Sequence, residues 1–308
     1  MQINKISLSD LFSQLIASFR LVGDNPWRFA LASLLFFLVI SALMFLIGGL
    51  AFASIGQERI LSFFTSVAAQ NTKAMFYFYA FFFIYYLALV PVLGGWLKFC
   101  QKLDIGTNAA SSEIFTIYKS VPELKKLILY FVVSVLLYLA VTSLLELLLL
   151  AFGIDISSLA TKSGGNPSQI LNMGIGFWIA ILGMACIGFL TQGMLYLGFI
   201  DTALSENSIV DSLKAGIRGV LKSLLSIIVF TIIMGIILAL CILMSALAGI
   251  ALTLLHKGFA EVVWVVFFLV LLLFAMPLSN AWQYYFWKDI LGKDNTIETR
   301  ISDSEVSA

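Results

Sequence analysis

Six long apolar blocks divide the chain, and the segments between them carry most of its charged residues. Each block is long enough to cross the ~30 Å hydrocarbon core of a bilayer, which takes ~20 helical residues. Backbone groups in lipid must be satisfied within their own segment, and the alternating pattern of barrel strands is missing, so each block is predicted to be a helix. The pattern therefore predicts an all-α, polytopic membrane protein with six transmembrane helices. They cover residues 27–52, 75–97, 127–152, 173–199, 224–255 and 262–286.

Lysine and arginine are distributed unevenly among the connecting segments. Fourteen of the 18 lie before or at the start of the first block, after the second, after the fourth and after the last, and four lie in the other three connections. Positively charged residues are retained on the cytoplasmic side of a membrane. We therefore expect a multi-pass protein of the bacterial inner membrane with both termini in the cytoplasm and three short loops outside.

The second, fourth and sixth blocks, which return the chain to the cytoplasmic side, have the same spacing of residues near their ends. A proline or threonine is followed five residues later by one aromatic residue and three residues after that by another. The sets are Pro91, Trp96 and Phe99; Thr191, Tyr196 and Phe199; and Pro277, Trp282 and Tyr285. We expect the aromatic pairs to lie half exposed at the headgroup boundary, and the prolines to loosen their helices. The alternative to a repeat is the general enrichment of aromatic residues at membrane interfaces.

The segments that precede the first, third and fifth blocks also resemble one another. Ser7 with Asp10, and Ser208 with Asp211, fit the S-x-x-D pattern of a helix start, and the middle segment has a looser version before Glu113. In the first segment apolar residues recur at helical spacing, which predicts an amphipathic helix in the headgroup plane. These residues are Leu8, Leu11, Phe12, Leu15, Ile16 and Phe19.

The predicted unit is thus an interfacial amphipathic helix, a span, an outer loop and a returning span. It occurs three times as tandem hairpins, at about 7–106, 110–207 and 208–292, within a single transmembrane domain of residues 1–292. Residues 293–308 are polar and acidic, and we expect a disordered cytoplasmic tail there.

The last block ends in the phrase Phe286-Trp287-Lys288-Asp289-Ile290. With the six spans and the amphipathic prefaces, this phrase resembles the YciC-like group of bacterial inner-membrane proteins. The chain also looks like the membrane domain fused to some glycerophosphodiester phosphodiesterases. The resemblance implies the six-span architecture but no activity, and it carries over no functional residues.

Composition narrows the possible chemistry. The chain is 61% apolar and 11% charged, with a mean hydropathy of +1.04, whereas soluble domains are about 45–50% apolar. A net charge of +1 gives no reason to expect nucleic acid, and the separated Cys100, Cys186 and Cys241 suggest no metal site or disulfide. The single histidine, His256, lies in a loop, and no nucleophile–base, metallohydrolase or phosphate-loop motif occurs. We therefore expect no enzyme, cofactor or metal.

Glu146 is the one ionisable residue well inside a predicted span. Intramembrane carboxylates often serve proton or ion movement. Glu146 is six residues from the outer end of its span, roughly 9 Å at ~1.5 Å per residue. From that depth it can also reach the interface or pair with Tyr77 or Tyr79, so a transport role and a packing role both stay open.

Uncharged polar residues gather in the inner halves of the fourth and sixth blocks. They are Thr191, Gln192, Ser279, Asn280 and Gln283. Such residues can line a cavity that is open to the cytoplasm, or they can join helices by hydrogen bonds, which are worth about 0.6 kcal/mol on average in membranes.

Lys214, Arg218 and Lys222 stand four residues apart, on one helix edge. Beside anionic headgroups each basic residue can contribute about 1 kcal/mol. The same residues satisfy the charge rule for topology, so lipid contact is one of two explanations for them. Membrane lipids are the partners that the sequence suggests.

The sequence favours a non-enzymatic scaffold, accessory or lipid-interacting component. The alternative is a transporter or channel for a small solute or ion, because transporters often contain internal repeats and broken helices.

Overall fold

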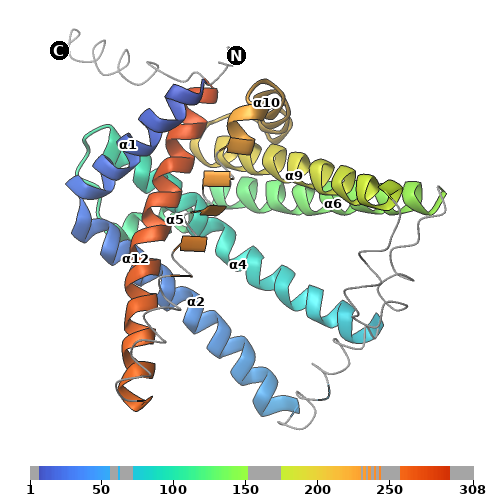
Figure 1. Ribbon diagram of the computed structural model, residues 1–308. Helices are drawn as coiled ribbons and strands as arrows, with labels where there is room; N and C mark the ends of the chain where they lie inside the picture. Colours follow the sequence, from blue (N-terminus) through green and yellow to red (C-terminus); the bar gives the residue numbers. More distant parts are fainter. Residues whose placement is uncertain are drawn as a thin grey trace.

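The computed structural model describes residues 7–55, 62, 72–151, 175–229 and 257–291, with residues 232, 233, 235, 236, 239, 240 and 243 between the last two ranges. Within these ranges the secondary structure is helical, and no strand occurs (Figure 1). The helices are α1 (Leu8–Asp24), α2 (Pro26–Ile55), α4 (Thr72–Asp104), η1 (Ser111–Phe115), α5 (Thr116–Lys119), α6 (Val121–Ala151), α9 (Ile175–Leu204), α10 (Ile209–Lys222) and α12 (Lys257–Ile290).

Four helices in the described ranges are long and apolar enough to cross a membrane. They contain the segments Pro26–Leu46 of α2, Met75–Asp104 of α4, Val121–Ala151 of α6 and Leu182–Leu204 of α9. The all-helical class and the membrane character are therefore confirmed, and these segments overlap the first four predicted blocks. Most of the fifth block, His256 and the predicted tail lie outside the described residues. The sixth block falls within the continuous helix α12.

The helix starts follow the capping patterns. The Ser7 side chain accepts a hydrogen bond from the Asp10 amide, and the Ser7 amide donates to the Asp10 carboxylate at 2.7 Å, which completes a capping box for α1. These bonds hold the pKa of Asp10 below its ordinary value. At the start of α10 the Ser208 side chain likewise accepts a hydrogen bond from the Asp211 amide, at 3.2 Å. The middle segment departs from this, because η1 is a 3₁₀ helix without a side-chain cap.

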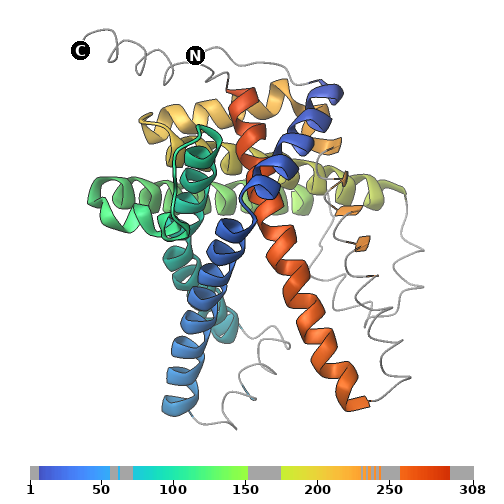
Figure 2. The ribbon, with the colours of Figure 1, turned by 90° about the vertical axis from the view of Figure 1, so that its left-hand side faces the viewer.

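Most of the buried apolar side chains form one cluster, the hub, where helices from several parts of the chain meet. Phe29 packs edge-to-face on Phe99 with ring centroids 5.2 Å apart, and Phe36 packs on Trp96 at 5.8 Å. The hub is made by Leu11 of α1, Phe29 and Phe36 of α2, Trp96 and Phe99 of α4, Ile114 of η1, Ile200 of α9, Val220 of α10, and Trp287 and Ile290 of α12. The start of α1 and the end of α12 lie side by side at this end of the molecule (Figures 1 and 2).

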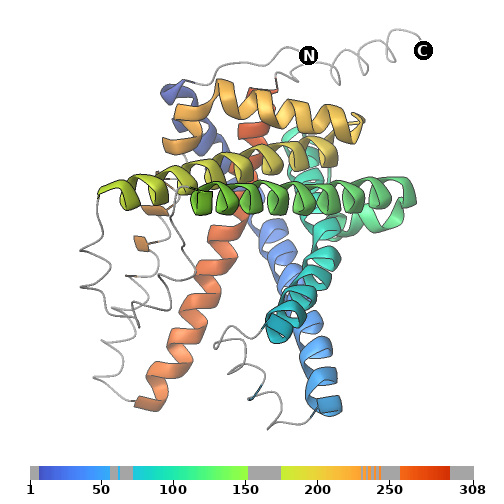
Figure 3. The same cartoon turned by 90° about the vertical axis from the view of Figure 1, so that its right-hand side faces the viewer.

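Away from the hub the long helices diverge. The α6–α9 pair runs across the direction of α2 and α12 (Figure 3), whereas spans of one bilayer are usually tilted by only about 20°. The far halves are exposed, as at Phe45 (83%) and Leu147 (64%). In the described ranges the long helices thus pack together at the hub. Contacts in these ranges do not hold the opposite ends of the helices parallel.

The expectation that the aromatic pairs are half exposed is wrong for both residues of the first copy and for Trp282 of the third, whereas Tyr285 is partly exposed. Trp96, Phe99 and Trp282 are fully buried, whereas Tyr196 is 41% exposed. An aromatic side chain buries about 150–250 Å² and dominates the packing of a core. In the first copy both rings belong to the hub, and in the third copy Trp282 is buried inside the protein while Tyr285 packs partly buried against the hub.

Glycine allows two close helix contacts at the hub. A Cβ atom on Gly95 of α4 would lie 1.9 Å from the carbonyl oxygen of Ile114 in η1. One on Gly216 of α10 would lie 2.2 Å from the carbonyl oxygen of Met194 in α9. Both contacts are backbone against backbone, so a side chain at either glycine would push the two helices apart.

Candidate functional site

Polar side chains join helix ends near the hub, and one such group is centred on Asp104 at the end of α4. Tyr284 and Tyr285 of α12 donate hydroxyl hydrogen bonds to the two carboxylate oxygens of Asp104 at 2.8 and 2.6 Å. Lys288 of α12 donates to the same carboxylate at 3.1 Å. Three donors from the last helix therefore converge on one acidic residue that is 180 positions earlier in the chain.

A second acidic residue, Asp201 near the end of α9, is fully buried. Its carboxylate accepts hydrogen bonds from Asn207 and from the hydroxyl of Ser212, each at 2.8 Å. Buried carboxylates are costly unless they are hydrogen-bonded. Asp201 thus fixes the turn between α9 and α10, and helps to hold α10 against α9.

The middle segment is joined to α4 by ion pairs. Lys102 donates to Glu113 at 2.9 Å, and Lys98 donates to Glu123 at 2.6 Å. The Thr116 hydroxyl also donates to Glu113. The hydrogen bond from Thr116, followed by that from Lys102, holds the pKa of Glu113 below its ordinary value. Glu113 therefore stays ionised at neutral pH and links η1 to α4.

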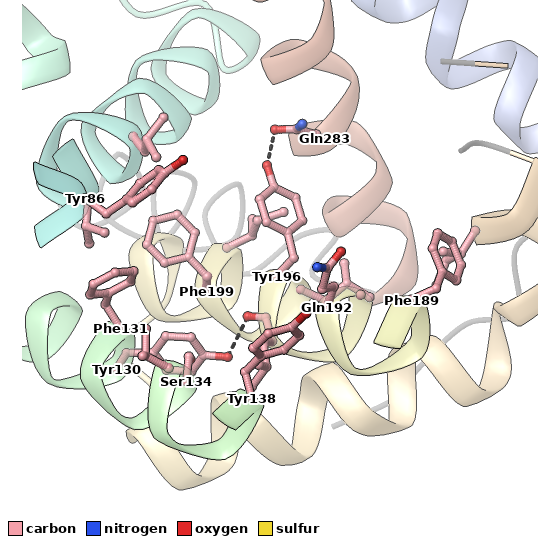
Figure 4. Close-up of a pocket in the computed structure, with 18 of the residues that line it drawn as sticks. Tyr86, Tyr130, Phe131, Ser134, Tyr138, Phe189, Gln192, Tyr196, Phe199 and Gln283 are labelled. Atoms are coloured by element: carbon pink, nitrogen blue, oxygen red, sulfur yellow. Dashed lines mark hydrogen bonds between the residues drawn. The ribbon is translucent and has the colours of Figure 1, made fainter. Parts of the chain in front are cut away.

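A groove of about 680 Å³ lies between α4, α6, α9 and α12 (Figure 4). This volume lies in the range of roughly 300–1,000 Å³ that is typical of small-molecule sites. None of the described residues that line the groove has a formal charge, and aromatic rings make up much of the wall. The rings are those of Tyr86, Tyr130, Phe131, Tyr138, Phe189, Tyr196, Phe199 and Phe286.

A few polar groups lie on this apolar wall. The Tyr196 hydroxyl donates to the side-chain oxygen of Gln283, which joins α9 to α12 across the groove (Figure 4). The Tyr130 hydroxyl donates to the carbonyl of Leu195 at 2.7 Å. Gln192 is exposed in the groove, and within the described ranges no protein group hydrogen-bonds its carboxamide. The groove can therefore offer an uncharged hydrogen-bonding group beside a large apolar surface.

The predicted polar residues are only partly brought together. Gln192 and Gln283 both line the groove. Thr191 and Asn280 hydrogen-bond carbonyls of their own helices, at Ile187 and Met276, and do not line it.

Glu146 lies apart from the groove, on an exposed part of α6. Tyr77 and Tyr79 are also exposed, and within the described ranges no hydrogen bond joins either tyrosine to Glu146. The hypothesis of a Glu146–tyrosine pair thus has no support in the structure.

The basic residues Lys214, Arg218 and Lys222 are exposed along one edge of α10. The opposite face of α10, which includes Gly216 and Val220, is buried against the rest of the molecule. Beside the basic edge lie three exposed apolar side chains, those of Val210, Ile217 and Leu221. The helix thus presents a mixed basic and apolar surface to its surroundings.

The predicted apolar stripe of α1 is divided between two surroundings. Leu11 of the stripe is buried, as are Leu21 and the polar Gln14, whose amide donates to Asp289 of α12 at 2.6 Å. Phe12, Ile16 and Phe19 are 57–68% exposed. The buried face of α1 is therefore the one that contains Gln14. The apolar side chains of Phe12, Ile16 and Phe19 form a stripe that faces away from the protein.

Sequence reasoning missed Asp104, Asp201 and the groove tyrosines Tyr86, Tyr130 and Tyr138, and it assigned Tyr196 to the headgroup boundary. Acidic residues shortly after the second and fourth blocks could have suggested polar contacts at the helix ends. The partners of Asp104 could not be identified, because they lie about 180 positions later in the chain. Tyrosines in an aromatic-rich membrane sequence give no such signal. Within the described ranges no group of three or more histidine, cysteine, aspartate or glutamate side chains could hold a metal ion.

Comparison of the chain with protein-family models, with curated proteins and with solved structures gives no significant match.

Proposed function

We propose that the protein is a non-enzymatic, lipid-interacting component of the bacterial inner membrane, related to the YciC-like group. In this proposal it crosses the membrane six times as three tandem hairpins, with the hub and both termini on the cytoplasmic side. The convergence of described helix ends on one hub supports the proposal, since hairpins that enter from one side bring their ends together.

The outer surfaces of α1 and α10 carry the lipid-interacting part of the proposal. Both helices lie at the hub end, where the long helices begin or end, and both expose large apolar side chains there. A helix with an exposed apolar stripe beside basic residues is suited to the headgroup plane of an anionic leaflet. The stripe provides burial in the acyl boundary, and Lys214, Arg218 and Lys222 provide attraction to phosphate groups.

Replacing Lys214, Arg218 and Lys222 together with glutamine is expected to weaken the retention of anionic lipid on the order of 100-fold. The basis is a contribution of about 1 kcal/mol from each basic residue near an anionic surface, with tenfold for each 1.4 kcal/mol. The measurement is a titration of phosphatidylglycerol into the purified full-length protein in mild detergent, with bound lipid counted by native mass spectrometry.

The matched control is the triple glutamine variant of Lys73, Lys162 and Lys257, which loses the same charge on the side predicted to be outside. Its retention of phosphatidylglycerol should equal that of the wild type. Equal lipid loss in both triple variants would point to net charge alone and would contradict a lipid surface on α10. Unchanged retention in the α10 variant would contradict it as well.

A further inference from the structure

The groove between α4, α6, α9 and α12 lies within helices that are long and apolar enough to span a membrane. Gln192 lies 12 residues before the end of α9 at Leu204, about 18 Å along the helix at ~1.5 Å per residue. In the proposed six-span arrangement, in which α9 crosses the membrane, this distance is well inside a hydrocarbon core of ~30 Å. A molecule that reaches the groove from its surroundings therefore comes from the lipid phase.

At this depth the carboxamide of Gln192 needs a polar partner. Moving such a group into an apolar medium without a hydrogen bond costs roughly 2–7 kcal/mol. The neighbouring Thr191 and Asn280 bond to their own helices, and Gln283 bonds Tyr196, whereas Gln192 has no bonding group among the described residues. The Ser134 hydroxyl of α6, which also lines the groove, is buried without a hydrogen-bond partner among the described residues. The groove thus holds unpaired polar groups on α6 and α9, on an aromatic wall.

The charge of the lining decides which lipids fit. No described lining residue is acidic or basic, so a phosphate or ammonium group in the groove would be buried without a counter-charge. Uncharged carbonyl or hydroxyl oxygens can bond the carboxamide without this penalty. Apolar chains can pack against the rings of Phe131, Tyr138 and Phe199, which face the groove in Figure 4.

We propose that this groove is a binding site for a neutral lipid, with a carbonyl or hydroxyl oxygen hydrogen-bonded to Gln192 and an apolar chain along the aromatic wall. The inference rests on the proposed lipid-interacting role and adds a ligand class that differs from the anionic headgroups at α10. Diacylglycerols and isoprenoid quinones both have the required chemistry.

The test uses the full-length protein in nanodiscs with a diacylglycerol that carries a diazirine in one acyl chain. The probe should crosslink to α6 and α9 peptides that line the groove. Gln192→Leu removes the polar partner, and Leu139→Trp fills the groove from α6, where Leu139 is 53% exposed and has room for a larger side chain. Each substitution should raise the apparent Kd about tenfold, corresponding to ~1.4 kcal/mol.

Two matched controls stand beside these variants. Thr191→Val removes a neighbouring hydroxyl on α9 that does not line the groove, and Leu136→Trp adds the same ring at a position on α6 outside it. Both should bind the probe as the wild type does. Competition by unlabelled diacylglycerol or by an isoprenoid quinone would support the site and identify which of the two it prefers.

Three results would overturn the proposal: no crosslink in the groove, equal binding by all four variants, or equal labelling by a phosphatidylglycerol with the same diazirine chain. The first is also the result if another part of the chain or a second copy fills the groove. Retention of phosphatidylglycerol at α10 is measured separately. A negative result for the groove would therefore not contradict the lipid surface of α10, and a negative result for α10 would not contradict the groove.

Discussion

Replacing Asp104 with asparagine is expected to destabilise the folded protein by roughly 3 kcal/mol. Three donors, from Tyr284, Tyr285 and Lys288, converge on the two oxygens of this carboxylate. Asparagine offers one acceptor oxygen, and its amide would face a donor. Hydrogen bonds to charged groups contribute about 1.5–3 kcal/mol, and removing one partner of a buried ion pair costs 3–5 kcal/mol. We use the lower end, because the Lys288 side chain is 32% exposed.

The measurement is the Tm of the purified protein in mild detergent, where 3 kcal/mol corresponds to a fall of roughly 6–12 °C. Asp24→Asn is the matched control. Its carboxylate is 67% exposed and lies 3.8 Å from Arg20, and exposed pairs of this kind are worth at most about 1 kcal/mol. Similar Tm values for Asp104→Asn and the wild type would show that Asp104 does not hold α4 to α12.

A graded loss of stability is expected when three glycines of the spanning helices are replaced by alanine. Gly95→Ala should be the most destabilising, by about 3 kcal/mol, because its Cβ would lie 1.9 Å from a backbone oxygen of η1 that cannot turn away. Gly94→Ala should cost less, since its Cβ would meet the end of the flexible Leu127 side chain at 2.6 Å. Gly188→Ala should be neutral or stabilising by up to ~1 kcal/mol, because its Cβ meets no atom within 4 Å and alanine favours a helix.

The order of the three Tm values is the decisive readout, because each substitution adds the same methyl group to a helix. If Gly95→Ala were as stable as Gly188→Ala, η1 would not be packed against α4 as described. A loss in Gly188→Ala as large as that in Gly95→Ala would mean that the far half of α9 has neighbours outside the described ranges.

The helices themselves were predictable from the sequence, because hydropathy and capping are local properties. The first four apolar blocks overlap α2, α4, α6 and α9, and the serines at positions 7 and 208 cap α1 and α10. The absence of a side-chain cap in the middle copy agrees with its looser pattern.

The hub and the groove were not predictable, since both depend on which helices meet. Aromatic residues at the end of a span are suited to the headgroup boundary and to a packed core alike. Trp96 and Tyr196 hold the same place in their sequence patterns, yet Trp96 is buried and Tyr196 reaches Gln283. In the same way, nothing in the chain order indicates that Asp104 meets the tyrosines of the last helix.

The most direct test of the account is the side of the membrane on which the hub lies. Single cysteines replace Thr107 or Glu206, which are exposed near the hub, and Ser62 or Ser157, in segments predicted to be outside, after the three native cysteines are changed to alanine. A membrane-impermeant maleimide is then added to spheroplasts. The account predicts that Ser62→Cys and Ser157→Cys react at once, whereas Thr107→Cys and Glu206→Cys react only after the membrane is broken. Reaction of either hub cysteine in intact spheroplasts would contradict three hairpins that enter from the cytoplasmic side.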